Sequence, residues 1–265
     1  MKLAVISGGV LLAVVAVGTI GFLVAGCSLH RPTPHAESPG GRRHAAAVVS
    51  SDHPSAPKLD DPAVTRVGGD AQVITEFVDG EFRSGNCRIP TPLPEGYPSP
   101  TPPGAIELKR YPLVRRAEIG GTMTPDWGMN FAFFPLFNHI KRRDIAMTSP
   151  VELNYAGLEP STSKGPESWT MSFLYRSADL APAGIDPKDA RVLIEDIQPV
   201  VVVAIGMRGD YKLNRVKKGV SELRGWLSQQ TEWEEAGEPR ALFYNGPEVR
   251  SRDKWLEVQL PLRRR

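Results

Sequence analysis

The chain has 265 residues, enough for one large domain or two small ones. Basic and acidic residues nearly balance, 32 against 30, and the basic runs are short and local. A nucleic-acid interface gathers such charge on one element with interleaved aromatic side chains, and the sequence contains no such element. The composition therefore predicts a protein without a nucleic-acid partner.

The N-terminus carries a long apolar stretch, Leu3 to Gly26, behind one basic residue, Lys2. It ends in Leu23-Val24-Ala25-Gly26-Cys27, where small residues precede a cysteine as in a bacterial lipobox. This pattern predicts a secretory signal, residues 1–27, with lipidation of Cys27. The stretch is also long enough to span about 30 Å of hydrocarbon, so a transmembrane anchor is the alternative.

Either anchor places the chain on a membrane, and lipidation places its body outside the cytoplasm, in the cell envelope. Arg31, Arg42 and Arg43 follow the stretch, whereas only Lys2 precedes it. For a spanning helix, this distribution of charge favours a cytoplasmic body. We expect a membrane-anchored protein that is extracytoplasmic if Cys27 carries lipid.

Residues 28–104 are expected to form a tether. Up to about residue 69 they are rich in Pro, Ser, Ala, Gly and His and show no apolar period. Residues 71–82 are compatible with one strand, and the Pro-rich stretch 90–103 predicts an extended spacer or an ordered loop. If Cys27 is lipidated, Cys87 has no disulfide partner within the chain, and we expect a thiol in a mobile segment, with a reactive or intermolecular role as the alternative.

The compact body is expected over residues 105–262, where one β-α-β-β unit occurs twice. The first copy comprises a strand over 106–121, an aromatic helix over 127–141, and strands over 145–155 and 169–175. The second comprises a strand over 192–206, a helix over 211–230, and strands over 240–244 and 255–260. Pro112 and Pro199 occupy the same place in their copies, and proline within a strand predicts a bend there. The fold class is therefore α+β, a distorted antiparallel β-barrel flanked by two helices.

Both helices carry apolar side chains at helical spacing. In the second helix the apolar residues are Leu213, Val216, Val220, Leu223 and Leu227. In the first helix they are Phe133, Leu136, Phe137 and Ile140. Pro135 interrupts the first stripe and predicts a kink or a restart of the helix.

The most distinctive segment is the aromatic stretch Asn130–Ile140, which leads into Ile145-Ala146-Met147-Thr148-Ser149-Pro150-Val151. An aromatic helix followed by an I-x-M-T-x-P-V strand resembles the SOUL haem-binding protein family. The resemblance covers about residues 106–262 and includes the segments Tyr111-Pro112, Met171–Leu174, Val192–Val203 and Trp255–Val258. It implies the duplicated barrel that is also seen in GyrI-like effector-binding domains.

The resemblance also implies a binder of haem or another tetrapyrrole, held in a shallow apolar groove beside the first helix. The candidate groove residues are Phe133, Phe137 and Ile140, and those at the rim for the propionates are Lys141, Arg142 and Arg143. The same residues are compatible with a plain packing role, because an apolar stripe suits a core and basic side chains suit a helix C-terminus. Haem is a possible cofactor, bound as a ligand.

Axial ligation of haem iron has few candidates. His30, His35, His44 and His53 lie in the expected tether, and His139 is the histidine of the body. It lies about 110° from the centre of the apolar stripe at 100° per residue, so it is a candidate ligand or a boundary residue. Met147 is a second candidate, although a buried strand methionine usually packs. Two isolated cysteines predict no zinc site.

Signatures of common enzymes are missing, including G-x-S-x-G, the P-loop, H-E-x-x-H and the dinucleotide-binding fingerprint. We expect a binding protein and not an enzyme. Two alternatives to the tetrapyrrole binder stay open. One is a binding module for another apolar ligand or for a protein partner, and the other is an enzyme acting on a tetrapyrrole or a lipid.

Overall fold

The computed structural model describes residues 63–265. The expectations for the N-terminal signal, for Cys27 and for the histidines at positions 30, 35, 44 and 53 lie outside the described residues. No helix within residues 63–265 is long and apolar enough to cross a membrane.

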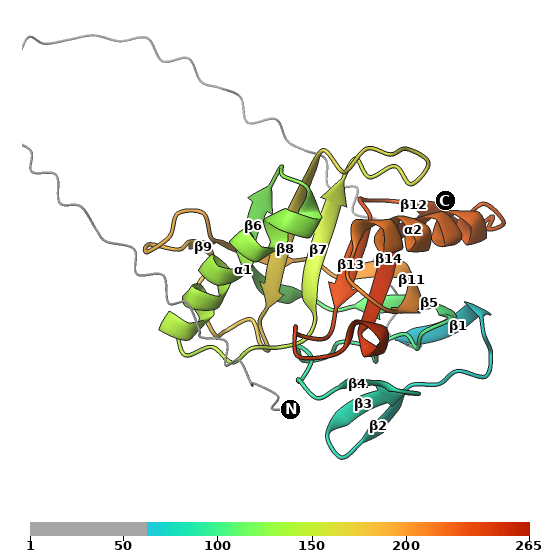
Figure 1. The fold of residues 1–265 in the computed structure, drawn as a ribbon, viewed down its shortest axis with the longest axis horizontal. Helices are drawn as coiled ribbons and strands as arrows, with labels where there is room; N and C mark the ends of the chain where they lie inside the picture. The colour runs from blue at the N-terminus through green and yellow to red at the C-terminus, as the bar shows by residue number, and fades with distance from the viewer. Residues whose placement is uncertain (1–62) are drawn as a thin grey trace, which may run out of the picture. The chain divides into compact units, whose positions relative to one another are not determined.

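A large antiparallel sheet forms the centre of the fold (Figure 1). Its strands are β1 (Val64–Gly69), β5 (Ala105–Tyr111), β6 (Val114–Gly121), β7 (Val151–Ala156), β8 (Ser168–Leu174), β9 (Gly184–Ile185), β10 (Leu193–Ile197), β11 (Val200–Arg208), β12 (Trp233–Glu235), β13 (Arg240–Phe243) and β14 (Trp255–Arg264). They lie in the order β1-β5-β11-β14-β13-β7-β8-β6-β10-β9, and β12 pairs with β14. A second sheet contains β2 (Glu76–Val78), β3 (Glu81–Ser84) and β4 (Cys87–Ile89). The helices are α1 (Pro125–Arg142), α2 (Leu213–Leu227) and a short 3-10 turn, Ser251–Asp253.

The two prolines predicted to bend the leading strands mark breaks in the sheet. β5 ends at Tyr111 and β6 begins at Val114, while β10 ends at Ile197 and β11 begins at Val200. The broken strands pair with one another, Tyr111 opposite Val200 and Val114 opposite Ile197. Because proline has no N–H to donate to a ladder of hydrogen bonds, both broken strands change their pairing partner at the same point.

The predicted α+β class is confirmed, with a large antiparallel sheet and two α-helices. The predicted barrel is not confirmed, because the hydrogen-bonded path through residues 63–265 has two ends, β1 and β9. The chain itself links the outer parts of this path, since β5 continues into β6 and β10 into β11 across the proline breaks. Barrel closure therefore remains a prediction.

α1 and α2 pack against the same apolar cluster of the sheet (Figure 1). α1 contributes Leu136 and Ile140 to this cluster, and α2 contributes the stripe predicted from the sequence, with Val216 and Leu223 fully buried. Pro135 lies inside α1 and is buried, but the helix continues through it to Arg142. The predicted restart at Pro135 is therefore wrong.

Residues 63–104 fold onto the body and do not form a tether. β1 pairs with β5 along the edge of the large sheet. In the Pro-rich stretch, the backbone N–H of Thr101 donates to Oε1 of Glu257 at 2.7 Å, and Nε1 of Trp255 donates to the carbonyl of Thr101 at 2.7 Å. The ordered body accordingly begins near Val64 and not at residue 105.

The region expected to be one strand over 71–82 contains β2, a turn and β3 instead. Asp79 and Gly80 form that turn with positive φ angles of 53° and 81°. Cys87 on β4 is 1% exposed and packs with Ile89 in a second apolar cluster, so it is not a thiol in a mobile segment. Burial raises its pKa, which makes the thiol less reactive.

Candidate functional site

The outer face of α1 carries a row of aromatic side chains that are open to solvent. Trp127, Phe131, Phe134 and Phe137 are 72%, 69%, 65% and 40% exposed. Their spacing of three and four residues places them on one side of the helix. We call these four residues the aromatic ridge; Met123, 59% exposed, lies in the segment just before the helix. Large aromatic side chains this exposed are unusual for a soluble surface and indicate a binding surface.

The inner face of α1 is held firmly against the sheet. Ala132, Leu136 and Ile140 are buried in the main core. Gly128 allows a close approach, because a Cβ placed there would lie 2.3 Å from the ring of Trp169. The indole Nε1 of Trp169 donates to the carbonyl of Met123 at 2.6 Å, which fixes the entry to the helix.

This placement changes the set of residues predicted to line a groove. Ile140 is 4% exposed and faces the core, so its predicted role in a groove is corrected. Phe133 is half-buried at the boundary, in edge contact with Phe173 at 5.2 Å between ring centroids. Phe137 stacks on Phe133 at 6.0 Å and is the member of the predicted set that also belongs to the ridge.

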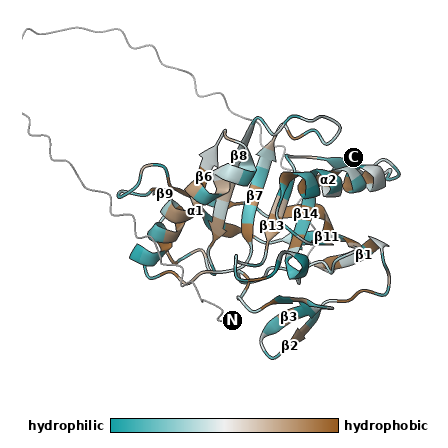
Figure 2. Cartoon of the chain, in the orientation of Figure 1, coloured by the Kyte–Doolittle hydropathy of each residue, from teal (hydrophilic) through white to brown (hydrophobic). Residues whose placement is uncertain are grey.

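Basic residues gather at the C-terminal end of α1, where Figure 2 shows hydrophilic teal beyond the brown stretches of the helix. Lys141 is exposed and Arg143 is half-buried. The guanidinium group of Arg142 already has a partner, because its Nη2 donates to Oδ2 of Asp186 at 2.9 Å. Of the predicted rim residues, Lys141 is therefore the best placed to meet a ligand, because Arg143 lies close enough to the buried Tyr175 for its charge to act on that hydroxyl.

His139 lies inside the protein. The sequence analysis considered it as a haem ligand or as a boundary residue, and neither role anticipates this position. Its side chain is fully buried; Nδ1 contacts Oδ2 of Asp186 and Nε2 lies 2.6 Å from the hydroxyl of Tyr175. Burial works against ionisation of Asp186, but the hydrogen bonds from His139, Arg142 and the Lys188 backbone lower its pKa to about 2. Because both ring nitrogens of His139 already have partners, neither is free to bind haem iron. The contacts with Asp186 and Tyr175 instead hold α1 to the rest of the protein.

The I-x-M-T-x-P-V segment also has a structural role. Met147 is half-buried and packs against the main core. The hydroxyl of Thr148 donates to the carbonyl of Leu174, and that of Ser149 donates to the carbonyl of Tyr244 at 2.9 Å. These bonds join the segment to β8 and to the end of β13, as expected for side chains that satisfy backbone groups at a strand entry.

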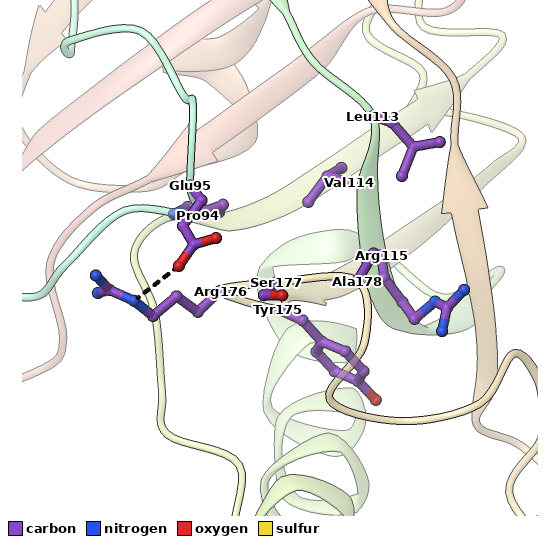
Figure 3. Close-up of a pocket in the computed structure, with 9 residues that line it drawn as sticks. All are labelled: Pro94, Glu95, Leu113, Val114, Arg115, Tyr175, Arg176, Ser177 and Ala178. Atoms are coloured by element: carbon purple, nitrogen blue, oxygen red, sulfur yellow. Dashed lines mark ion pairs between the residues drawn. The ribbon is translucent and has the colours of Figure 1, made fainter.

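A small pocket opens beside Tyr175, close to the end of β8 (Figure 3). Its volume is about 150 Å³. Arg115 and Leu113 line one side, and the ion pair of Arg176 with Glu95, 3.6 Å apart, lies on the other. Small-molecule sites usually measure roughly 300–1,000 Å³, so this pocket does not enclose a tetrapyrrole.

The face of the sheet opposite the helices carries buried charges that the sequence analysis missed. Glu152 lies between two arginines, with Oε1 2.5 Å from Nη1 of Arg116 and Oε2 3.2 Å from Nη1 of Arg240. Glu257 accepts from Nζ of Lys109 at 2.9 Å and from the hydroxyl of Tyr244 at 2.6 Å. Burial opposes the ionisation of both glutamates, but the neighbouring cations bring the pKa of each below its usual value.

No cluster of metal-ligating side chains occurs in the described part of the chain. The feature that sequence reasoning missed on α1 is the outer aromatic set. A signal for it was present, since Trp127, Phe131 and Phe134 recur at helical spacing in the same window as the predicted stripe. Because one helix carries two apolar stripes, the sequence alone does not show which stripe packs against the sheet.

A family model described as SOUL heme-binding protein matches residues 99–261. This chain belongs to the SOUL family. The match covers both copies of the β-α-β-β unit, including α1 and the segment after it. The strands β1 to β4 precede the matched residues and extend the SOUL domain at its N-terminus.

Solved structures show only a distant likeness to the SOUL domain. A complex of EcmrR with DNA is 13% identical, covers 59% of this chain and 56% of its own, and has a TM-score of 0.48. The C-terminal domain of EcmrR is 14% identical, with coverages of 60% and 96% and a TM-score of 0.45. A hydrolase from Listeria innocua is 14% identical, with coverages of 62% and 93% and a TM-score of 0.46. At these values the likenesses say nothing about what the SOUL domain binds.

The chain spans little more than half of the EcmrR chain in the DNA complex, 56% of its length. A comparison with curated proteins finds no significant relative. Family membership and the geometry of α1 are therefore the two observations that bear on function.

Proposed function

We propose that this chain is a membrane-anchored binding protein for haem or another tetrapyrrole, and that the ligand lies with its flat face against the aromatic ridge of α1. Membership of a heme-binding family supports the ligand class. The observation that carries the location is the exposure of Trp127, Phe131 and Phe134, each above 60%. The apolar stretch of residues 3–26 and Cys27 support the anchor and an extracytoplasmic body.

The chemistry of the ridge suits a porphyrin. A porphyrin is a flat apolar plate with two carboxylates, and aromatic rings give such a plate both area and stacking partners. Burying roughly 200 Å² of its surface gains roughly 5 kcal/mol at ~25 cal/mol/Å², before the cost of association. Lys141 lies about 10 Å along the helix axis from Phe134, so a plate seated on Phe134 and Phe137 brings its edge toward the basic residues at the end of the helix, with Lys141 the nearest. These cations suit the propionates.

Iron ligation is not needed for this mode of binding. Haem iron takes His, Met, Cys or Tyr as ligands. His139 is enclosed by Asp186 and Tyr175, and Met147 packs against the core. We therefore propose that the ridge recognises the macrocycle and its carboxylates, and that iron-free protoporphyrin IX binds about as well as haem.

The test is a titration of the full chain, embedded in lipid nanodiscs, with haem and with protoporphyrin IX. Quenching of Trp127 is obtained as the difference between the wild type and Trp127→Phe. The expected result is saturation near one equivalent for both ligands, with dissociation constants within about threefold of each other. Empty nanodiscs correct for ligand dissolved in lipid.

Two variants locate the site. Phe134→Asp places a charge in the centre of the ridge and should weaken binding at least tenfold. Phe77→Asp changes a side chain of similar exposure, 64%, on the β2–β3 hairpin and should leave binding unchanged. Equal effects of the two variants, or a signal that rises without saturation, would overturn the proposal. The second outcome would favour a module for another apolar ligand or for a protein partner.

A further inference from the structure

The aromatic ridge lies on a convex helix, and no described segment covers it. Its four members are exposed on α1, while two pockets of residues 63–265 lie elsewhere, one beside Tyr175 and one beside Trp233. A flat or convex apolar surface suits a partner that has no fixed shape. A lipid bilayer is such a partner.

We propose that the aromatic ridge of α1 docks into the interfacial layer of a lipid bilayer, so that a tetrapyrrole reaches the ridge from the lipid and not from water. Delivery of a tetrapyrrole from the lipid rests on the proposed function; the docking itself does not. Helices that lie in this layer have large apolar side chains on one face and bury them about 5–10 Å deep. Tryptophan and phenylalanine are suited to this position because the layer is apolar on one side and wet on the other.

The polar residues around the ridge are consistent with this orientation. Asn130 and Asn138 share the outer face of α1 and are exposed, so they can stay among headgroups. Lys141 follows on the same face, one turn beyond Phe137. With Arg142 and Arg143 it forms a basic end, which is opposed by the exposed Asp144 and by the buried Asp186 that pairs with Arg142. This excess of positive charge complements anionic headgroups.

The sequence N-terminal to the described residues allows the same orientation. An apolar stretch of membrane-spanning length, residues 3–26, belongs to the same chain. A chain as long as residues 27–62 reaches at most roughly 130 Å at 3.3–3.6 Å per residue, whereas α1 is only about 27 Å long. A body attached at residue 63 can therefore place α1 on the bilayer that holds its own N-terminus. The sequence and the part of the chain that the structure describes contain no comparable feature that favours a second protein molecule as the partner of the aromatic ridge.

Depth-dependent quenching tests the docking. The full chain is reconstituted into vesicles of phosphatidylcholine and phosphatidylglycerol whose acyl chains carry bromine, with no tetrapyrrole present. The difference between the wild type and Trp127→Phe isolates Trp127 from the other four tryptophans, of which Trp169 and Trp255 are buried. We expect Trp127 emission to shift to the blue and to lose at least half of its intensity.

Matched variants separate ridge docking from anchoring. Phe131→Asn with Phe134→Asn should reduce the quenching of Trp127 to background while the chain stays bound to the vesicles. Phe77→Asn, an equally exposed aromatic outside the ridge, should leave the quenching unchanged. Lys141→Ser should lower the ratio of docked to undocked protein roughly fivefold on anionic vesicles, the effect of one basic residue near such a surface.

Two results would overturn the docking. In one, Trp127 is not quenched by brominated lipid and is quenched by iodide from water. In the other, Trp127 is shielded from iodide before lipid is added, which shows that a second copy of the chain covers the ridge. Because no tetrapyrrole is present, failure here leaves the haem titration unaffected. If docking occurs but the titration fails, the ridge is a membrane contact only and does not receive a tetrapyrrole from the lipid.

Discussion

His139 on α1 and Asp186, which follows β9 directly, form a buried contact between Nδ1 and a carboxylate oxygen. The same carboxylate oxygen accepts from Arg142, and Asp186 Oδ1 accepts from the backbone N–H of Lys188 at 2.7 Å. The C-terminal half of α1 is thereby held to a loop 47 residues further along the chain. The orientation of the aromatic ridge depends on this attachment as well as on the apolar core.

The first prediction is that Asp186→Asn lowers the free energy of unfolding by about 3 kcal/mol at pH 7, because it removes a buried carboxylate that contacts His139 and accepts hydrogen bonds from Arg142 and from the Lys188 backbone. Urea unfolding measures the change. The folded-state pKa of Asp186, about 2, lies below its ordinary value of 3.8, so the stabilisation is present above pH 4 and is lost as the pH falls through about 2. The difference between wild type and variant should therefore shrink below pH 4.

Asp189→Asn is the matched control for this prediction. Asp189 pairs with Arg191 at 2.6 Å, but Arg191 is 66% exposed, and such surface pairs contribute little to stability because water screens them. A similar loss for both variants, or a difference for Asp186→Asn that stays constant down to pH 2, would contradict the role given to the His139–Asp186 contact.

The second prediction concerns Lys109, whose Nζ lies 2.9 Å from Glu257 with both side chains fully buried. Lys109→Met leaves the carboxylate of Glu257 inside the protein with hydrogen bonds but no cation, and should lower the free energy of unfolding by about 3–5 kcal/mol. Lys218→Met is the control, because Lys218 is 70% exposed and its contact with Glu222 is 3.8 Å long. The control should change stability by less than 1 kcal/mol. A loss below 1 kcal/mol for Lys109→Met, measured by urea unfolding, would show that the pair is not coupled to the fold.

The third prediction concerns Glu118 on β6, where burial, opposed in part by Arg116, raises the pKa to about 7. A carboxyl group with a raised pKa binds its proton more tightly in the folded state, so wild-type stability should fall as the pH rises from 4.5 to 7. Glu118→Gln removes this dependence and should gain up to about 3 kcal/mol relative to wild type between pH 4.5 and pH 8. Urea unfolding at four pH values measures the gain. For Glu222→Gln, at an exposed position, the difference from wild type in the free energy of unfolding should not change with pH. If the difference for Glu118→Gln is equally independent of pH, the pKa of Glu118 is not raised.

The order of elements could be predicted from the sequence because alternation and helical spacing report burial directly. Pro112 and Pro199 showed where the leading strands break, since a residue without an N–H cannot stay in a ladder. The sequence could not reveal that Glu107 and Lys109 point into the protein. Alternating charges beside apolar residues are also the pattern of a strand with one solvated face, and only the packing of residues 63–104 against that face buries them.

The candidate site shows a similar limit. The aromatic helix was predicted, but α1 has apolar side chains around most of its circumference, so spacing alone does not say which side meets the sheet. Gly128 was the residue that decides this, because only a position without a side chain can face Trp169 at such close range. Facing Gly128 and Leu136 inward places Trp127 and Phe134 on the opposite side of the helix, and that geometric consequence needs the partner strand to be known.

The last prediction tests this placement of α1. Gly128→Ala puts a Cβ 2.3 Å from the Trp169 ring, so the helix or the indole must shift, and overpacking of this kind destabilises by about 1–3 kcal/mol. Gly225→Ala on α2 is the matched control, since nothing lies within 4 Å of its added Cβ. There the substitution should stabilise by about 0.5–1 kcal/mol, because alanine loses less conformational entropy in a helix. Thermal and urea unfolding of both variants give the two signs. If Gly128→Ala also stabilises, α1 does not pack on Trp169, and the outward orientation of the aromatic ridge loses its structural cause.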